Sequence, residues 1–222
     1  MKRLLITALA LLAQTLVGKA QEPTTRWPYI FPQFQTGFVE INEGTTRTYP
    51  LNIHLRHGQL HYLDADGIIK EATIGEVIGA KVGSDYYLQA RGEMMRVVAR
   101  SEHGCVVEEV LGDFAALNET GGAYGSSSNT SATRKLSSIE TDSQINQNHM
   151  LLMQSRSDGQ LLDLIKTLYL VYPGYVVKAN RSEVEKVIPA EQSAAWKTWI
   201  KNHKIKWNQP ESLVSLLEFL NP

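Results

Sequence analysis

The sequence has little of several things that common functional classes require. Of its 222 residues one is cysteine, Cys105, which excludes an intrachain disulfide and a cysteine-rich metal knuckle. The 22 Lys+Arg and 23 Asp+Glu residues leave a formal charge of −1. Because there is no basic surplus to neutralise phosphates, we expect no nucleic-acid partner.

Catalytic signatures are also missing. The chain has no GxSxG elbow, no HExxH pair, no Walker loop and no GxGxxG after a strand, and these motifs mark widespread hydrolases and nucleotide-binding proteins. Cys105 stands in the apolar, strand-like segment 104–107, a context that favours a buried thiol over a nucleophile. We therefore expect a non-enzymatic protein without a cofactor.

One long apolar run is present, and it lies within residues 1–20. Met1–Arg3 is cationic, Leu4–Val17 is mostly apolar, and Gly18-Lys19-Ala20 supplies small residues before Gln21. This three-part layout is typical of a secretory signal peptide. Cleavage leaves 202 residues with 19 basic and 23 acidic groups, a charge of −4. No second run approaches the length of a membrane span, so we expect an exported chain with no transmembrane span after processing.

Residues 21–35 predict an extended aromatic arm, because two prolines within residues 27–34 forbid a helix. Its aromatic side chains are candidate binding residues: Trp27, Tyr29, Phe31 and Phe34. They either dock on the protein's own sheet or present an apolar surface to a partner. Docking is favoured, because an exposed apolar patch is costly for a soluble monomer.

Residues 36–112 predict an antiparallel β-meander. Short strand-like segments alternate with glycine-bearing turns roughly every 8–12 residues, which is not the spacing of βαβ units. The expected strands are Phe38–Ile41, Thr48–Leu55, Leu60–Asp64, Ile68–Ile69, Tyr86–Ala90, Met94–Arg100 and Cys105–Leu111. In Thr48–Leu55, apolar and polar residues alternate, which predicts one buried face and one solvent-exposed face that carries His54.

The second half of the chain changes character. Residues 113–147 are rich in Ser, Thr and Gly, and such a loop cannot bury enough apolar area to offset its own ordering. Residues 148–179 predict β-hairpins that complete the sheet. Within them Leu161–Tyr172 is ambiguous by period between helix and strand, and the Pro173-Gly174 turn that follows favours a strand.

Residues 180–222 predict C-terminal helices. Asn180 or Ser182 can cap the first of them, Pro189 opens the second, and the last runs over Glu211–Leu220. The basic residues Lys197, Lys201, Lys204 and Lys206 form either a solvated helix face or a surface for an acidic partner or lipid headgroups. The fold class expected overall is α+β, an antiparallel β-meander (a curved sheet or partial barrel) followed by a small C-terminal helical segment.

Two histidines form the sharpest candidate site. If His57-Gly58 is a two-residue turn, His54 and His61 face each other on the solvent-exposed side, with β-carbons ~5 Å apart. Two imidazoles at that separation could share a transition metal. Zinc sites use three or four ligands, however, and the pattern places no third. The alternative is a pair of solvent-facing histidines, and a metal-dependent hydrolase is the lowest-ranked function.

Several short motifs occur in an order that resembles a known family. The signal peptide, the aromatic arm and the meander are followed by Ala123-Tyr124-Gly125-Ser126, Thr130–Thr133, Val187-Ile188-Pro189, Ile205-Lys206-Trp207 and Glu211-Ser212-Leu213. This order resembles small, uncharacterised exported proteins of Gram-negative gut and environmental bacteria. The resemblance implies an envelope location, periplasmic or associated with the outer membrane, and it implies no reaction.

These observations lead to two expectations about function. The first is a non-enzymatic envelope protein that binds another envelope protein through a sheet edge or the aromatic arm, because a meander leaves edges to which a strand can add. The second is a glycan- or peptide-binding module with aromatic side chains as its platform.

Overall fold

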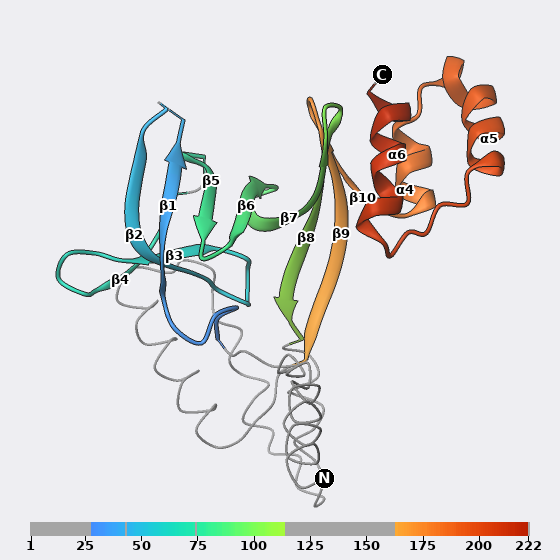
Figure 1. Ribbon diagram of the computed structural model, residues 1–222. Coiled ribbons are helices and arrows are strands. Elements are labelled where there is room, and N and C mark those ends of the chain that lie inside the picture. The colour runs from blue at the N-terminus through green and yellow to red at the C-terminus, as the bar shows by residue number, and fades with distance from the viewer. Residues whose placement is uncertain (1–27, 43, 74, 114–162, 222) are drawn as a thin grey trace, which may run out of the picture.

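The computed structural model describes residues 28–42, 44–73, 75–113 and 163–221 (Figure 1). The predictions for the signal peptide 1–20, for Trp27, for most of the loop 113–147 and for residues 148–162 fall outside the described residues. Among the described helices, none is long and apolar enough to cross a membrane.

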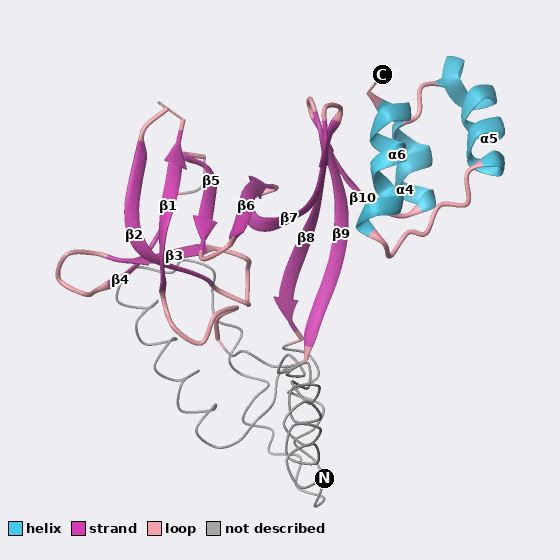
Figure 2. Cartoon of the chain, in the orientation of Figure 1, coloured by secondary structure: helices cyan, strands magenta, loops and turns pink. Residues whose placement is uncertain are grey.

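The described strands form one antiparallel sheet of ten strands in the order β10-β9-β8-β7-β6-β5-β1-β2-β3-β4. Their bounds are β1 Gln35–Ile41, β2 Thr46–Ile53, β3 Leu60–Leu63, β4 Ile69–Glu71, β5 Val77–Val82, β6 Asp85–Ala90, β7 Glu93–Ser101, β8 Gly104–Gly112, β9 Leu164–Tyr172 and β10 Tyr175–Lys178. Helices follow the sheet (Figure 2). The α+β fold class predicted from the sequence is therefore confirmed, and Leu164–Tyr172 is a strand.

The strand order departs from a simple meander at one point. After β4 the chain returns across the sheet, and β5 pairs with β1 rather than with β4. Strand β5 was not among the strands expected from the sequence, because its one glycine and one alanine weaken the strand pattern. Its apolar face is nevertheless buried, since Val77, Ala80 and Val82 all lie in the core.

Two tight turns follow directly from their residues. Arg91 and Gly92 connect β6 to β7, with φ angles of 58° and 87°. Positive φ at both central positions is the type I′ geometry that matches the twist of a hairpin. Pro173-Gly174 connects β9 to β10, and Gly174 takes a φ of 79°.

Buried side chains form one large cluster in the N-terminal half and another beneath the helices, and β7 contributes to clusters on both of its faces. Met94 packs with Leu51, Ile53 and Tyr87 inside the N-terminal half. The next residue, Met95, belongs to a cluster on the opposite face, because successive strand residues point to opposite sides. Two backbone hydrogen bonds connect the β2–β3 turn to later strands: Met94 N of β7 donates to Gly58 O, and Gly112 N of β8 donates to Leu55 O.

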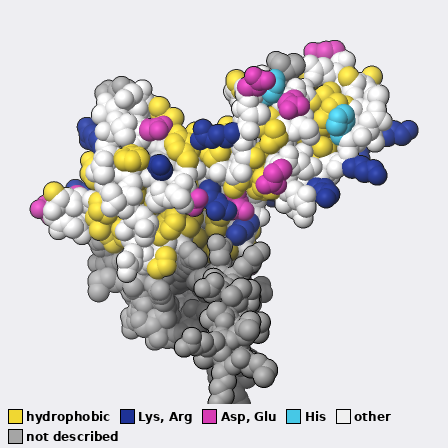
Figure 3. Space-filling model, viewed as in Figure 1, with side chains coloured by type: hydrophobic (Ala, Val, Ile, Leu, Met, Phe, Trp, Pro, Cys, Tyr) yellow, Lys and Arg dark blue, Asp and Glu magenta, His cyan; other side chains and the backbone are white. Residues whose placement is uncertain are grey.

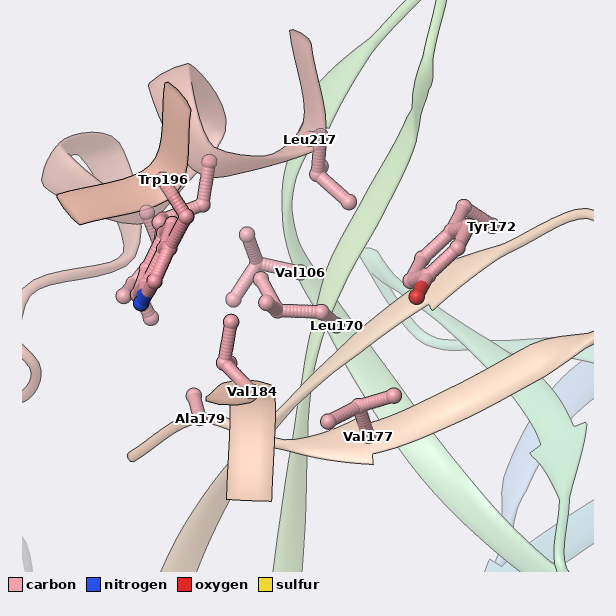
Figure 4. Close-up of a cluster of buried hydrophobic side chains, with 10 residues drawn as sticks. Val106, Leu170, Tyr172, Val177, Ala179, Val184, Trp196 and Leu217 are labelled. Atoms are coloured by element: carbon pink, nitrogen blue, oxygen red, sulfur yellow. The ribbon is translucent and has the colours of Figure 1, made fainter. Parts of the chain in front are cut away.

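The C-terminal helices cover one face of β8, β9 and β10. They are α4 (Arg181–Val187), a 3-10 turn (Ala190–Gln192), α5 (Ser193–Asn202) and α6 (Pro210–Leu220). Asn180 caps α4 by accepting a hydrogen bond from Glu183 N, as one of the two predicted caps. Figure 4 shows how the helices meet the strands: Trp196 and Leu217 approach Val106 and Leu170 from the helical side.

Candidate functional site

A groove of about 360 Å³ lies where two hairpin turns meet the end of α6. Tyr86 and Leu88 of β6, Arg100 of β7 and Cys105 of β8 line it, together with Pro173 from the β9–β10 turn. The space-filling view shows that the surface is hollowed between the strands of the N-terminal half and the part that carries the C-terminal helices, here called the helical lobe (Figure 3). A concavity with a few polar groups among apolar ones is the usual form of a binding site.

Arg100 is the basic side chain of this groove and Glu102 is its acidic one, and Tyr86 positions Arg100. The Arg100 guanidinium lies over the Tyr86 ring, with its carbon 4.7 Å from the ring centroid. The Tyr86 hydroxyl donates a 2.8 Å hydrogen bond to Glu40 Oε2, which fixes the ring. Burial, and then the hydrogen bond to Glu40, raises the pKa of Tyr86 to about 12. The tyrosine therefore stays neutral, and its ring face attracts the cation.

One wall of the groove is tied to the end of the chain. Asn221 Nδ2 donates to His103 O at 2.9 Å, and His103 Nδ1 lies 2.7 Å from Asn221 O. Because a carbonyl oxygen only accepts, the Nδ1 atom of His103 must carry the hydrogen. This reciprocal pair fastens the β7–β8 turn to the residue after α6, so the rim of the groove is held by two elements far apart in the sequence.

Cys105 lies in the groove as a half-buried free thiol. Burial raises the pKa of the Cys105 thiol, and the nearby Arg100 charge only partly opposes that effect. The thiolate is the reactive form of cysteine, so this environment suits an unreactive side chain. The sequence placed Cys105 in an apolar strand, and it does lie in β8.

The structure brings the two predicted histidines together, but not in the predicted register. His61 pairs with Asn52, and His54 N donates to Gln59 O. The turn therefore has four residues, and the histidines are diagonal neighbours with ring centroids 5.0 Å apart. The predicted solvent-exposed position is wrong, because His54 and His61 are 8% and 4% exposed.

The aromatic arm covers the histidines. Tyr29, 5% exposed, forms a β-bridge with His54, and its hydroxyl lies 2.9 Å from His61 Nδ1. Ile30 N donates to Ile53 O. The arm therefore pairs with the end of β2, on the same edge of that strand that β1 pairs with. Burial raises the pKa of Tyr29. The arm thus docks on the protein's own sheet, the favoured alternative, for the residues described.

The histidine geometry gives a metal ion little to bind. The rings are stacked with an interplanar angle of 25°, and nitrogen lone pairs lie in the ring plane, so nearly parallel rings do not aim them at one point. His54 Nδ1 accepts from Arg56 N, and Glu71 Oε2 is 3.8 Å from His61 Nε2. Within the part of the chain that the structure describes, no group of three or more His, Cys, Asp or Glu side chains could hold a metal ion.

The remaining arm aromatics are partly buried. Phe31 packs near the Tyr87 ring, with centroids 6.4 Å apart, and Phe34 meets the edge of Tyr29 at 5.1 Å. Asn52 ties down the backbone between them: its Oδ1 accepts from Phe31 N and its Nδ2 donates to Phe31 O. The two phenylalanines therefore help to dock the arm while leaving part of each ring at the surface.

Sequence reasoning missed a carboxyl pair at the start of β7. Glu93 lies beside Glu109 of β8, and its Oε2 atom is buried without a hydrogen-bond partner. Burial, followed by the hydrogen bond and charge of Glu109, raises the pKa of Glu93 to about 7. Glu109 in turn accepts a long 3.5 Å contact from the Tyr169 hydroxyl. The Glu93 carboxyl therefore keeps its proton to a higher pH than a free glutamate does.

Comparison with known proteins adds no relative to this description. No family model matches the sequence, and neither a curated protein nor a solved structure matches it.

Proposed function

We propose that this chain is an exported, non-enzymatic protein of the cell envelope that binds another envelope protein, and that the groove holds an extended acidic segment of that partner. The observation that carries the proposal is the Arg100 guanidinium, held over Tyr86 inside a groove of about 360 Å³. A pre-positioned guanidinium binds carboxylates through paired hydrogen bonds and loses little freedom in doing so.

The groove suits a peptide segment better than a glycan. Sugar-binding platforms use a free aromatic face, whereas Arg100 covers one face of Tyr86. Leu88, Val97 and Pro173 give the groove an apolar wall, and the polar side chains of Ser101, Glu102, His103 and Asn221 also line it. An extended chain with apolar residues around a carboxylate would match the Arg100 side chain and the apolar wall beside it.

The two binding surfaces expected from the sequence are less suitable. Tyr29 is buried by the docked arm, so it cannot meet a partner unless the arm leaves β2. The free edges of the described sheet are β4, with three residues, and β10, with four. Strand addition draws its affinity from a row of main-chain hydrogen bonds, and edges this short offer few of them.

The envelope location rests on the sequence. Met1–Ala20 has the charge, apolar run and small-residue exit of a signal peptide. The motif order also resembles exported proteins of Gram-negative bacteria. Membrane-associated and periplasmic forms would both present the groove to other envelope proteins.

The experiment that tests the proposal is site-specific photo-crosslinking in the native envelope. A photoreactive residue replaces Glu102, which is 88% exposed at the rim of the groove. A matched probe replaces Glu191, which is exposed at the far end of the helical lobe. We expect a discrete crosslinked protein from the first position and none from the second.

A substitution then connects the crosslink to Arg100. Arg100→Gln should abolish the crosslinked band, and Arg47→Gln, which removes the same charge from an exposed position on β2, should leave it intact. Thermal unfolding of both variants shows whether each is folded. A crosslink that survives in a folded Arg100→Gln variant would refute the role of the groove, and a melting-temperature increase with glycans alone would favour the sugar-binding alternative.

A further inference from the structure

The segment from α5 to the start of α6 carries charge of one sign. Between Ser193 and Gln209 the sequence has four lysines and no aspartate or glutamate. The residues are Lys197, Lys201, Lys204 and Lys206, and all four side chains are exposed. We call them the lysine surface. It stands out because the chain as a whole has a formal charge of −1.

Packing of α5 directs these lysines outward. Trp196 is 3% exposed and lies 5.6 Å from the Phe219 ring of α6, and Trp199 lies 5.1 Å from the same ring. The two tryptophans therefore face α6. Lys197 and Lys201 are four residues apart, so they lie one above the other on another side of the helix. Figure 3 shows Lys and Arg side chains at the outer margin of the helical lobe.

Helix α4 pairs its own charges, whereas the four lysines form no such pairs with the described residues. The pKa of Glu185 is lowered mainly by Arg181 and Trp196, and also by the charge of Lys197. In α4, Arg181 pairs with Glu185 at 2.8 Å and Lys186 pairs with Glu183 at 2.6 Å. No carboxylate among the described residues lies within ion-pair distance of the four lysines. The four side chains are exposed, so their ammonium groups are available to an anionic surface.

We propose that the lysine surface docks the protein on the anionic headgroups of a lipid bilayer. Exposed, flexible ammonium groups suit a broad plane of phosphates better than one defined carboxylate, because lysine acts as a point charge without a fixed geometry. Each lysine held close to an anionic bilayer strengthens binding roughly fivefold. None of the four lysines lines the groove, so this docking is independent of the function proposed for Arg100.

Vesicle flotation tests the proposal. The purified protein is mixed with vesicles of phosphatidylcholine alone or of phosphatidylcholine with phosphatidylglycerol, at low and at high salt. We expect binding to the anionic vesicles only, and loss of binding at high salt, because salt screens exposed charges. Neutralising the lysine surface should weaken binding at least about tenfold; the variant is Lys197→Gln, Lys201→Gln, Lys204→Gln and Lys206→Gln combined.

A control variant removes the same charge elsewhere. It combines Lys81→Gln, Lys166→Gln, Lys178→Gln and Lys186→Gln, all at exposed positions. Circular dichroism and thermal unfolding show whether each variant is folded. Retained binding by the control would support the proposal, and equal weakening in both variants would overturn it in favour of net charge. Absence of vesicle binding, with lysine-dependent retention on a polyglutamate resin, would overturn it in favour of an acidic protein partner.

Discussion

The carboxyl pair at the start of β7 makes the stability of the protein depend on pH through a single side chain. Glu93 Oε2 is buried without a hydrogen-bond partner. Burial is the largest cause that raises the pKa of Glu93 from 4.5 to about 7, Glu109 adds to it, and Arg91 opposes it. The folded protein therefore binds this proton more tightly than the unfolded chain does. Glu93→Gln replaces the carboxyl with a neutral group of the same size that can still donate to Glu109.

The sign and size of the effect follow from linkage. Because the folded pKa is raised, the contribution of Glu93 to stability is complete below pH 4.5 and is lost as the pH rises through about 7. A shift from 4.5 to about 7 corresponds to ~3.4 kcal/mol without screening. Glu93 is only half-buried, so solvent screening reduces the expected loss to about 1–2 kcal/mol.

The assay is urea unfolding of the wild type and of Glu93→Gln across this pH range. The wild type should lose about 1–2 kcal/mol relative to the variant between acidic and mildly alkaline pH. Histidines titrate in the same range, but they are present in both proteins, so their effect cancels in the difference. Glu102→Gln, at an exposed carboxylate, is the control and should show no such divergence. A pH-independent difference between the wild type and Glu93→Gln would refute the reasoning.

Three further outcomes are expected. The full chain, expressed in a Gram-negative host, should yield a mature protein that begins at Gln21 by intact mass, and an unprocessed mass would contradict the signal-peptide prediction. Tyr29→Phe should lower the free energy of unfolding by about 1–2 kcal/mol in chemical denaturation, because it removes the hydroxyl beside His61 Nδ1; an unchanged midpoint would mean that this contact contributes no stability. Gly104→Ala should destabilise by about 2–3 kcal/mol, since Gly104 has a φ of 149° and an added Cβ would meet Val171 O. Gly67→Ala, at a φ of 74°, is the comparison variant and should cost less, because no atom lies within 4 Å of its added Cβ.

The parts of the fold that could be predicted from the sequence are those set by local geometry. A turn such as Pro173-Gly174 constrains two adjacent dihedral angles, and the strands on either side then pair by necessity. Asn180 is a cap because its short side chain reaches an amide three residues along. Neither inference depends on distant parts of the chain, and the structure agrees with both.

The parts that could not be predicted depend on which distant segments meet. Nothing in the local pattern of Val77–Val82 specifies that β5 adds beside β1 rather than beside β4. The same limit applies to His54 and His61, whose alternation suggested a solvent-exposed face. That face is buried because Tyr29, more than twenty residues earlier, docks on it.

The carboxyl pair shows how one irregularity can decide a site. Near the turn, β7 and β8 pair in one register, with Arg100 opposite Cys105, and beyond Val97 the register shifts by one residue. Without the bulge, Arg96 would face Glu109. With it, Arg96 faces Glu108 and binds that carboxylate at 2.7 Å. Because adjacent residues point to opposite faces, the shift moves Glu109 to the face of Glu93. A bulge is invisible to alternation, so the sequence alone does not show which of the adjacent residues Glu108 and Glu109 meets another acid.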